Sequence, residues 1–248
     1  MAANKTRAIA IAAGAALVLF GARTASAQGN TVTLQIQFDA AKPAKRAAAA
    51  EDRAGVVLWL TPVGAKAPAA APAAKPVATI AQQNKSFTPH VIAVQVGSAI
   101  AFPNKDHFLH NVFSLHDGKQ FDLGFYEAGS SKAVRFERPG VSYLFCNIHP
   151  EMTAAVVVVE TPYFALSDST GRISLANVPD GKYVLHLWSE RSLPEDLKKM
   201  EREVTVSSGA TELGALRIHE NPDFSSAHKN KYGQDYIPAS AAGDYNQP

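Results

Sequence analysis

Residues 77–160 divide into short apolar or alternating segments that are separated by turn residues, and none of these segments has a helical apolar period. The segments are VATIAQ, HVIAVQV, AIAFPN, HNVFSL, FDLGFY, SKAVRFE, VSYLFC and TAAVVVVE. Short runs of this kind with turns between them are typical of β-strands. About eight strands in so short a stretch predict a small antiparallel β-sandwich or barrel, whose edges must be closed or covered.

The sequence on both sides of this block also predicts strands. Apolar and polar residues alternate from Val32 to Phe38, and a second apolar segment runs from Gly55 to Thr61. The charged segment Ser192–Arg202 is compatible with one short helix. Further short strand-like segments lie at 163–166, 173–175, 183–187, 204–206 and 213–218. The predicted fold class is therefore all-β, with a second small β-sandwich beside the first.

Three segments are predicted to lie outside these blocks. Residues 40–53 are rich in Ala, Lys and Arg, have no apolar stripe and contain Pro43, which predicts a mobile loop. Residues 65–76 (AKAPAAAPAAKP) predict an extended Pro/Ala linker, and they mark a domain boundary. Residues 221–248 are polar and have no apolar period, which predicts an extended or disordered tail.

The first 27 residues predict a secretory signal peptide. Lys5 and Arg7 precede the apolar run 8–22, and the small residues ASA follow at 25–27. This order is typical of a signal that is cleaved, here after Ala27. A membrane anchor is the alternative, but the apolar run is shorter than the ~20 residues of a spanning helix.

The charge balance argues against nucleic-acid binding. The chain has 24 Lys and Arg residues against 22 Asp and Glu residues, a formal net charge of +2. Removal of the signal peptide takes away three basic residues, so the mature chain has 21 basic and 22 acidic residues and a net charge of −1. Nucleic-acid binding needs a concentrated basic surface, which this balance does not predict.

The only cysteine of the chain, Cys146, cannot form an internal disulfide in the oxidising compartment that the signal peptide predicts. It lies in the sequence YLFCNIHPEM, with His149 three residues and Met152 six residues downstream. A thiolate, an imidazole and a thioether are three donors of a blue-copper centre, which also needs a second imidazole. The segment 102–113 supplies one, with His110 at the start of a predicted strand. The structural alternative is a small buried cysteine beside a core methionine.

Residues 77–160 resemble cupredoxins of the plastocyanin and amicyanin type. The shared pattern is FxP at 87–89, VxVG at 94–97, FxNxD at 102–106, HNV at 110–112 and CxxHxxM at 146–152. The spacing of the last motif is similar to that of amicyanin. The resemblance implies a Greek-key β-sandwich that binds one type 1 copper ion. It implies His110, Cys146, His149 and Met152 as the ligands, and Asn111 as the residue that ties the two ligand loops together by hydrogen bonds.

The same resemblance separates the other histidines from the predicted site. The His-Asn-Val context selects His110, so His107, three residues earlier, is expected at the surface. The remaining histidines lack nearby donors in the sequence and are expected to be structural or solvated: His90, His116, His186, His219 and His228. The resemblance also implies that His149 is the exposed ligand, and the candidates for an apolar collar around it are Phe125, Phe145, Ile148 and Pro150.

The block after residue 160 resembles the second half of a carboxypeptidase-regulatory-like (transthyretin-like) β-sandwich. The matching turns are DSTGRISL at 168–175 and VPDGKYVL at 178–185. Domains of this kind open with strands that resemble 32–38 and 56–60. We therefore expect one discontinuous sandwich made of residues 29–64 and 161–220, interrupted by the cupredoxin-like domain at 77–160. Three sequential pieces are the alternative.

Together these features predict a periplasmic electron carrier that cycles between Cu(II) and Cu(I), and not an enzyme. A copper oxidase or nitrite reductase would need a second metal site with further histidines in strand context. The expected partners are transient redox proteins, such as a periplasmic dehydrogenase or a c-type cytochrome, and neither nucleic-acid binding nor stable membrane insertion is expected. Two alternatives stay open, a copper-binding or copper-delivery protein and a cell-envelope binding module without redox turnover.

Overall fold

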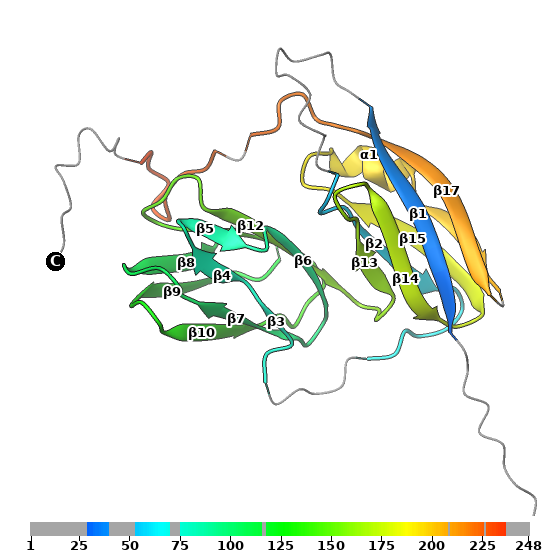
Figure 1. Ribbon diagram of the computed structural model, residues 1–248, viewed down its shortest axis with the longest axis horizontal. Coiled ribbons are helices and arrows are strands. Elements are labelled where there is room, and N and C mark those ends of the chain that lie inside the picture. The colour runs from blue at the N-terminus through cyan, green and yellow to red at the C-terminus, as the bar shows by residue number, and fades with distance from the viewer. Residues whose placement is uncertain are drawn as a thin grey trace, which may run out of the picture.

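The computed structural model describes residues 29–39, 53–69, 75–115, 118–207, 209–225 and 227–236. In these residues the chain is nearly all β, which confirms the predicted fold class, and its strands lie in two lobes (Figure 1). The predicted signal peptide, most of the predicted 40–53 loop and the middle of the predicted linker fall outside the described residues. No helix in the described part of the chain has both the length and the apolar character needed to cross a bilayer.

The central lobe contains residues 78–115 and 118–159. It has a five-stranded sheet in the order β6-β12-β11-β8-β9, a three-stranded sheet in the order β10-β7-β3, and the hairpin β4-β5. Most neighbours are antiparallel, as predicted, but β6 pairs with β12 and β3 with β7 in parallel, because the chain passes through another sheet before it returns. Its strands are β3 (Ala78–Thr79), β4 (Ala81–Gln83), β5 (Ser86–Thr88), β6 (Val91–Gln95), β7 (Ala99–Pro103), β8 (His110–Ser114), β9 (Phe121–Tyr126), β10 (Ser131–Arg135), β11 (Gly140–Phe145) and β12 (Thr153–Val159).

The flanking lobe contains residues 30–39, 53–62, 164–207 and 209–219. Its two sheets have the orders β14-β1-β17 and β13-β2-β15-β16. Strand β1 pairs antiparallel with β14 and parallel with β17, and β2 pairs antiparallel with β13 and β15. Segments that precede and follow the central lobe in the sequence therefore share both sheets. Its elements are β1 (Asn30–Asp39), β2 (Val57–Pro62), β13 (Phe164–Leu166), β14 (Arg172–Val178), β15 (Gly181–Trp188), the short helix α1 (Pro194–Lys199), β16 (Arg202–Val206) and β17 (Ala210–His219).

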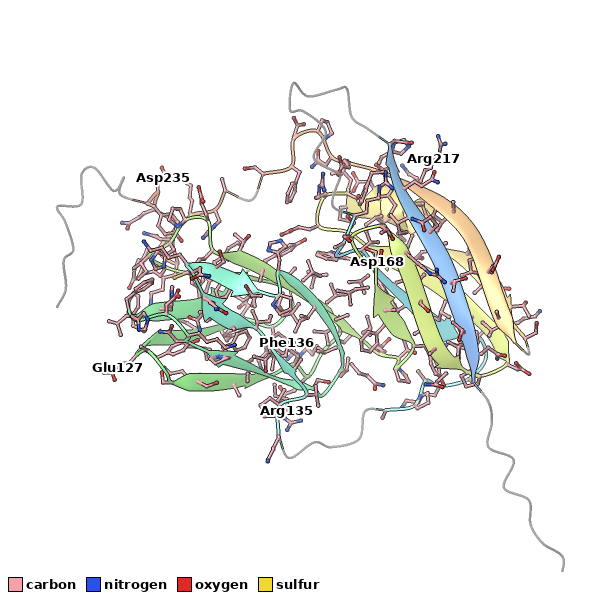
Figure 2. All side chains as sticks on the ribbon, in the orientation of Figure 1. Glu127, Arg135, Phe136, Asp168, Arg217 and Asp235 are labelled. Atoms are coloured by element: carbon pink, nitrogen blue, oxygen red, sulfur yellow. The ribbon has the colours of Figure 1, made fainter. Side chains whose placement is uncertain are left out.

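One face of strand β12 packs into the central lobe and the other face packs against the flanking lobe. All seven of its residues are buried. Ala154, Val156 and Val158 belong to the apolar core of the central lobe, together with Phe136 (Figure 2). The alternate residues, such as Val157, belong to a separate apolar cluster that includes Trp188 of the flanking lobe. Alternation along a strand explains this division, since successive side chains point to opposite faces. The apolar run at 153–159 therefore joins the lobes.

A polar contact lies beside this apolar joint. His90, between β5 and β6, directs Nδ1 to the Thr153 carbonyl at 2.9 Å and Nε2 to a Glu190 carboxylate oxygen at 2.6 Å. Both ring nitrogens face acceptors, which favours the imidazolium form. The hydrogen bond to Glu190 raises the pKa of His90, although burial opposes the shift.

We expect the contribution of this contact to stability to depend on pH. The folded-state pKa of His90 lies above the unfolded value of about 6.5, so its stabilisation is fully present below about pH 6.5 and is lost as the pH rises through the folded-state pKa. His90→Gln should therefore lower the unfolding temperature more at about pH 5.5 than at about pH 9. The side chain of His90 is 47% exposed, so the difference should be about 1 kcal/mol or less. Thermal unfolding at the two pH values checks it, and an equal decrease at both would contradict it.

Candidate metal centre

The strand order brings the two predicted ligand segments to the same end of one sheet. Strands β8 and β11 are antiparallel neighbours, with Phe145 opposite Phe113. His110 is the first residue of β8, and Cys146 directly follows the last residue of β11. In an antiparallel pair the start of one strand lies beside the end of the other. His110 and Cys146 therefore become neighbours although they are far apart in the sequence.

The turn between β11 and β12 carries the other predicted ligands. The Cys146 amide donates to the Met152 carbonyl at 3.3 Å, and the Met152 amide donates to the His149 carbonyl at 3.2 Å. These backbone bonds close the turn, so its residues keep fixed positions relative to one another. Met152 is fully buried and belongs to the same apolar cluster as Cys146. The structure thus places Met152 in the core beside the turn, and its role as a ligand stays a prediction.

Three donor atoms converge at this turn. The Cys146 sulfur lies 3.5 Å from Nδ1 of His149 and 3.9 Å from Nδ1 of His110. All three atoms lie within 4.8 Å of one another, and Cys146 and His110 are fully buried while His149 is half-buried. The structure therefore brings together the predicted thiol and both predicted imidazoles. One thiolate and two imidazole nitrogens around one point can hold a single transition-metal ion.

A carboxylate orients the His110 ring. Nε2 of His110 lies 2.7 Å from a carboxylate oxygen of Asp106, and Asp106 in turn accepts hydrogen bonds from the backbone amides of Asn84 at 2.7 Å and Lys85 at 2.9 Å. Burial acts to raise the pKa of Asp106, but the hydrogen bonds from Lys85, His110 and Asn84 outweigh it and lower the pKa. The charged Asp106 accepts a hydrogen bond from Nε2–H of His110. The proton therefore stays on Nε2, and Nδ1 presents its lone pair to the site.

The sequence analysis assigned no role to Asp106. The residue belongs to the motif at 102–106, and its spacing of four from His110 is the one signal in the sequence that could have pointed to this role. The spacing alone does not show which ring nitrogen the carboxylate contacts. That contact depends on the backbone amides that hold the carboxylate in place.

The site holds its donors in defined protonation states. Burial, followed by the proximity of His110 and Lys85, lowers the pKa of His149 to about 4, so its imidazole is neutral at pH 7 and can bind a metal ion. Burial also raises the pKa of the Cys146 thiol, although hydrogen bonds from nearby backbone amides oppose the shift. The metal-free site therefore holds a neutral thiol, and a metal ion must displace its proton.

Asn111 makes two different contacts. Its backbone amide hydrogen-bonds to the Cys146 sulfur, which ties β8 to the Cys146 turn. Its side-chain amide donates instead to Asp122 of β9 at 2.7 Å, and its buried Oδ1 has no partner among the described residues. The reason is a shift of register between β8 and β9 after Asn111, which places Asp122 opposite Phe113. The side chain of Asn111 ties β8 to β9.

The other histidines occupy separate places. His107 is exposed, as predicted, while His116 lies outside the described residues. His228, expected to be structural or solvated, stacks on Phe145 with 4.4 Å between ring centroids. Of the predicted collar, Phe125, Ile148 and Pro150 are exposed and Phe145 is half-buried beneath His228. An exposed ring that the sequence analysis did not name, Phe108, lies 5.0 Å from the His110 ring and 5.7 Å from the His149 ring.

We expect Asp106→Asn to weaken metal binding without unfolding the protein. The amide cannot match the charged acceptor that holds the Nε2 proton of His110, and loss of such a partner typically costs about 10- to 100-fold in metal affinity. A competition titration with copper measures the effect. Asp168→Asn is the matched control, because Asp168 also accepts two backbone amide bonds but lies on the flanking lobe (Figure 2). Equal affinities of the Asp106 variant and the wild type would contradict the orienting role.

Comparison with known proteins gives partial likenesses only. No protein-family model matches the chain, and no curated protein matches it. A copper-containing nitrite reductase from Thermus scotoductus is 28% identical over 40% of this chain and 25% of its own, with a TM-score of 0.33. A purple cupredoxin from Nitrosopumilus maritimus is 25% identical over 33% of this chain and 98% of its own, with a TM-score of 0.30. A mutant amicyanin in the Cu(I) state is 19% identical over 41% of this chain and 97% of its own, with a TM-score of 0.32.

The solved structures that resemble part of the chain thus include cupredoxins. The chain spans about a quarter of the nitrite reductase that it matches. Fold alone does not determine function, which depends on the side chains of the site.

Proposed function

We propose that the chain is a type 1 copper protein of the cupredoxin kind, related to plastocyanin and amicyanin, that carries single electrons between protein partners. The observation that supports this proposal most strongly is the buried thiol of Cys146, which faces Nδ1 atoms from two separate segments at 3.5 and 3.9 Å. A structural cysteine in a hydrophobic core does not need two imidazoles that point at its sulfur.

The donor set fits copper. A thiolate and two imidazoles, with a thioether as a weak fourth donor, are the ligands of blue-copper electron-transfer sites. His110, Cys146 and His149 would hold the ion, and Met152 is the proposed fourth ligand. When bound, copper supplies a one-electron couple between Cu(II) and Cu(I).

The residues around the donors are suited to electron transfer. Cys146, His110 and Met152 are fully buried, so the surrounding core excludes water from the site. His149 is half-buried, and the exposed side chains of Phe108 and Ile148 lie beside it. Exposed apolar side chains beside one accessible ligand suit a small, transient interface with a redox partner such as a dehydrogenase or a c-type cytochrome.

We further propose that the central lobe is a cupredoxin domain inserted into a carboxypeptidase-regulatory-like sandwich. The pairing of β1 with β14 and β17, and of β2 with β13 and β15, supports an outer domain made of two separate segments. The signal peptide expected at 1–27 supports a periplasmic location. The chain is proposed to act as a carrier and not as an enzyme.

A redox titration of the copper-loaded mature chain, residues 28–248, tests the carrier role. We expect one bound copper ion per chain and a visible absorption band that one electron bleaches and that returns fully on reoxidation. Copper that is bound but cannot be reduced and reoxidised without loss from the protein would contradict electron transfer and would favour copper delivery. A chain that binds no copper would favour a binding module.

A further inference from the structure

The polar chain after β17 does not stay on the lobe from which it comes. In Figure 1 it leaves the top of the flanking lobe and crosses to the central lobe. Figure 2 shows Asp235 beside the central lobe, whereas Arg217 of β17 lies on the flanking lobe. We call residues 227–236 the strap. The sequence predicted an extended or disordered tail here, and the described part of the strap contains no helix or strand.

The strap contacts three consecutive residues at the start of the ligand turn. The hydroxyl of Tyr236 donates to the Cys146 carbonyl at 2.5 Å. The ring of His228 stacks on Phe145 and places Nε2 2.9 Å from the Tyr236 oxygen. The Lys231 amide donates to Oδ1 of Asn147 at 3.0 Å. Burial raises the pKa of Tyr236 to about 12, so the hydroxyl keeps its proton and remains a donor.

Through Asp122 of β9, the strap is also connected to β8, the strand that carries His110. Nζ of Lys231 lies 2.8 Å from Oδ2 of Asp122, and Oδ1 of the same carboxylate accepts the side-chain hydrogen bond of Asn111 at 2.7 Å. Asn111 directly follows His110 in β8. Lys231 thus links the turn that holds Cys146 and His149 to the strand that holds His110. The strap therefore adds a second tie between the two ligand segments, beside the bond from the Asn111 backbone amide to the Cys146 sulfur.

Hydrogen bonds within the strap show that these contacts come from a folded turn. Oδ1 of Asn230 accepts the backbone amides of Tyr232 at 2.9 Å and Gln234 at 3.0 Å. The Asn230 backbone amide donates to the Gln234 carbonyl at 2.9 Å. This turn presents Lys231 and Tyr236 together to the ligand turn. Separate bonds to the ligand segments from one ordered turn restrict their relative movement more than the same bonds from a free chain.

We propose that Lys231 and Tyr236 are positioning residues that hold the two ligand segments in one arrangement. The strap keeps the ligand turn closed over the Cys146 thiol. The relevance of this role to a copper ion rests on the function proposed above, but its effect on the turn is a property of the metal-free protein. Because Cys146 is buried and is the only cysteine, its reaction with a thiol reagent requires the turn to open, and no other residue contributes to the signal.

The rate of reaction of the metal-free mature chain with a chromogenic disulfide reagent tests the proposal. Tyr236→Phe removes one hydrogen bond that exists only in the closed turn, so it should raise the rate about fivefold. Lys231→Met should raise it by a similar factor, and Lys231→Arg, which keeps the charge beside Asp122, should restore most of the protection. The matched control is Tyr183→Phe, which removes a hydroxyl-to-carbonyl bond of 2.9 Å to Pro179 on the flanking lobe.

The outcomes separate positioning from general stabilisation. We expect Tyr183→Phe to lower global stability in denaturant while leaving the thiol rate unchanged. We expect Tyr236→Phe to raise the thiol rate while leaving global stability nearly unchanged. Equal thiol rates for wild type and Tyr236→Phe would overturn the proposal, as would an equal increase in the Tyr183 control. The assay needs no copper, so a failure to bind copper would contradict the proposed function without deciding this test. In copper-loaded protein, Tyr236→Phe should also shift the reduction potential, and Tyr183→Phe should not.

Discussion

Cys146→Ser is expected to abolish the intense visible absorption band of the copper-loaded protein completely. The band arises from charge transfer between a thiolate and Cu(II), and Cys146 supplies the only thiol of the chain. Serine has nearly the same shape, but at neutral pH its hydroxyl is neither a thiolate nor a soft ligand. A visible spectrum of the mature chain titrated with Cu(II), recorded beside the variant, measures the effect.

The control for this variant is its fold. Cys146 is fully buried in the core of the central lobe, so a change there can also act by disturbing packing. Circular dichroism and thermal unfolding of the metal-free variant should remain close to those of the wild type, because one sulfur atom is replaced by one oxygen atom. A band of undiminished intensity in a folded Cys146→Ser protein would show that another group binds the copper ion.

The second large effect is expected at His110, where His110→Ala should remove copper binding at the site and also destabilise the metal-free protein. The imidazole contributes Nδ1 to the donor set, and its Nε2–H donates a hydrogen bond to the mostly buried carboxylate of Asp106. Removal of the imidazole leaves a buried acceptor without this bond, which typically costs about 1–3 kcal/mol. The free energy of unfolding in denaturant and a copper titration measure the two losses separately.

His107→Ala is the matched control, because His107 lies in the loop three residues before His110 but is exposed. It should leave both the copper affinity and the stability close to those of the wild type. A loss of copper binding in the His107 variant, with binding retained in the His110 variant, would contradict the assignment of the ligand.

Much of the fold follows from local sequence patterns. Alternation of apolar and polar residues predicted β1, and turn chemistry marked the turns that precede and follow β14. The run at 153–159 predicted a strand but not its second contact surface, because a strand buried on both faces shows no alternation. Its contact with the flanking lobe depends on which distant segments cover it. Local patterns do not contain that information.

The metal-binding side chains were easier to predict from the sequence than the groups that orient them. A thiol and an imidazole three residues apart identified Cys146 and His149, and the motif context identified His110. The Asp122 partner of Asn111 was not predictable, because it depends on a shift of register between two strands. The strap was not predictable either. Hydrogen bonds from Tyr236 and Lys231 hold it in place, and such bonds leave no apolar period in the sequence.

The most direct test of the copper assignment is the X-ray absorption spectrum at the copper edge of the copper-loaded mature chain. We predict a first coordination shell of two nitrogen atoms from His110 and His149 and one sulfur atom from Cys146, with the sulfur contribution absent in Cys146→Ser. A shell composed only of nitrogen and oxygen, or one that Cys146→Ser leaves unchanged, would contradict the proposal that the three converging side chains bind copper.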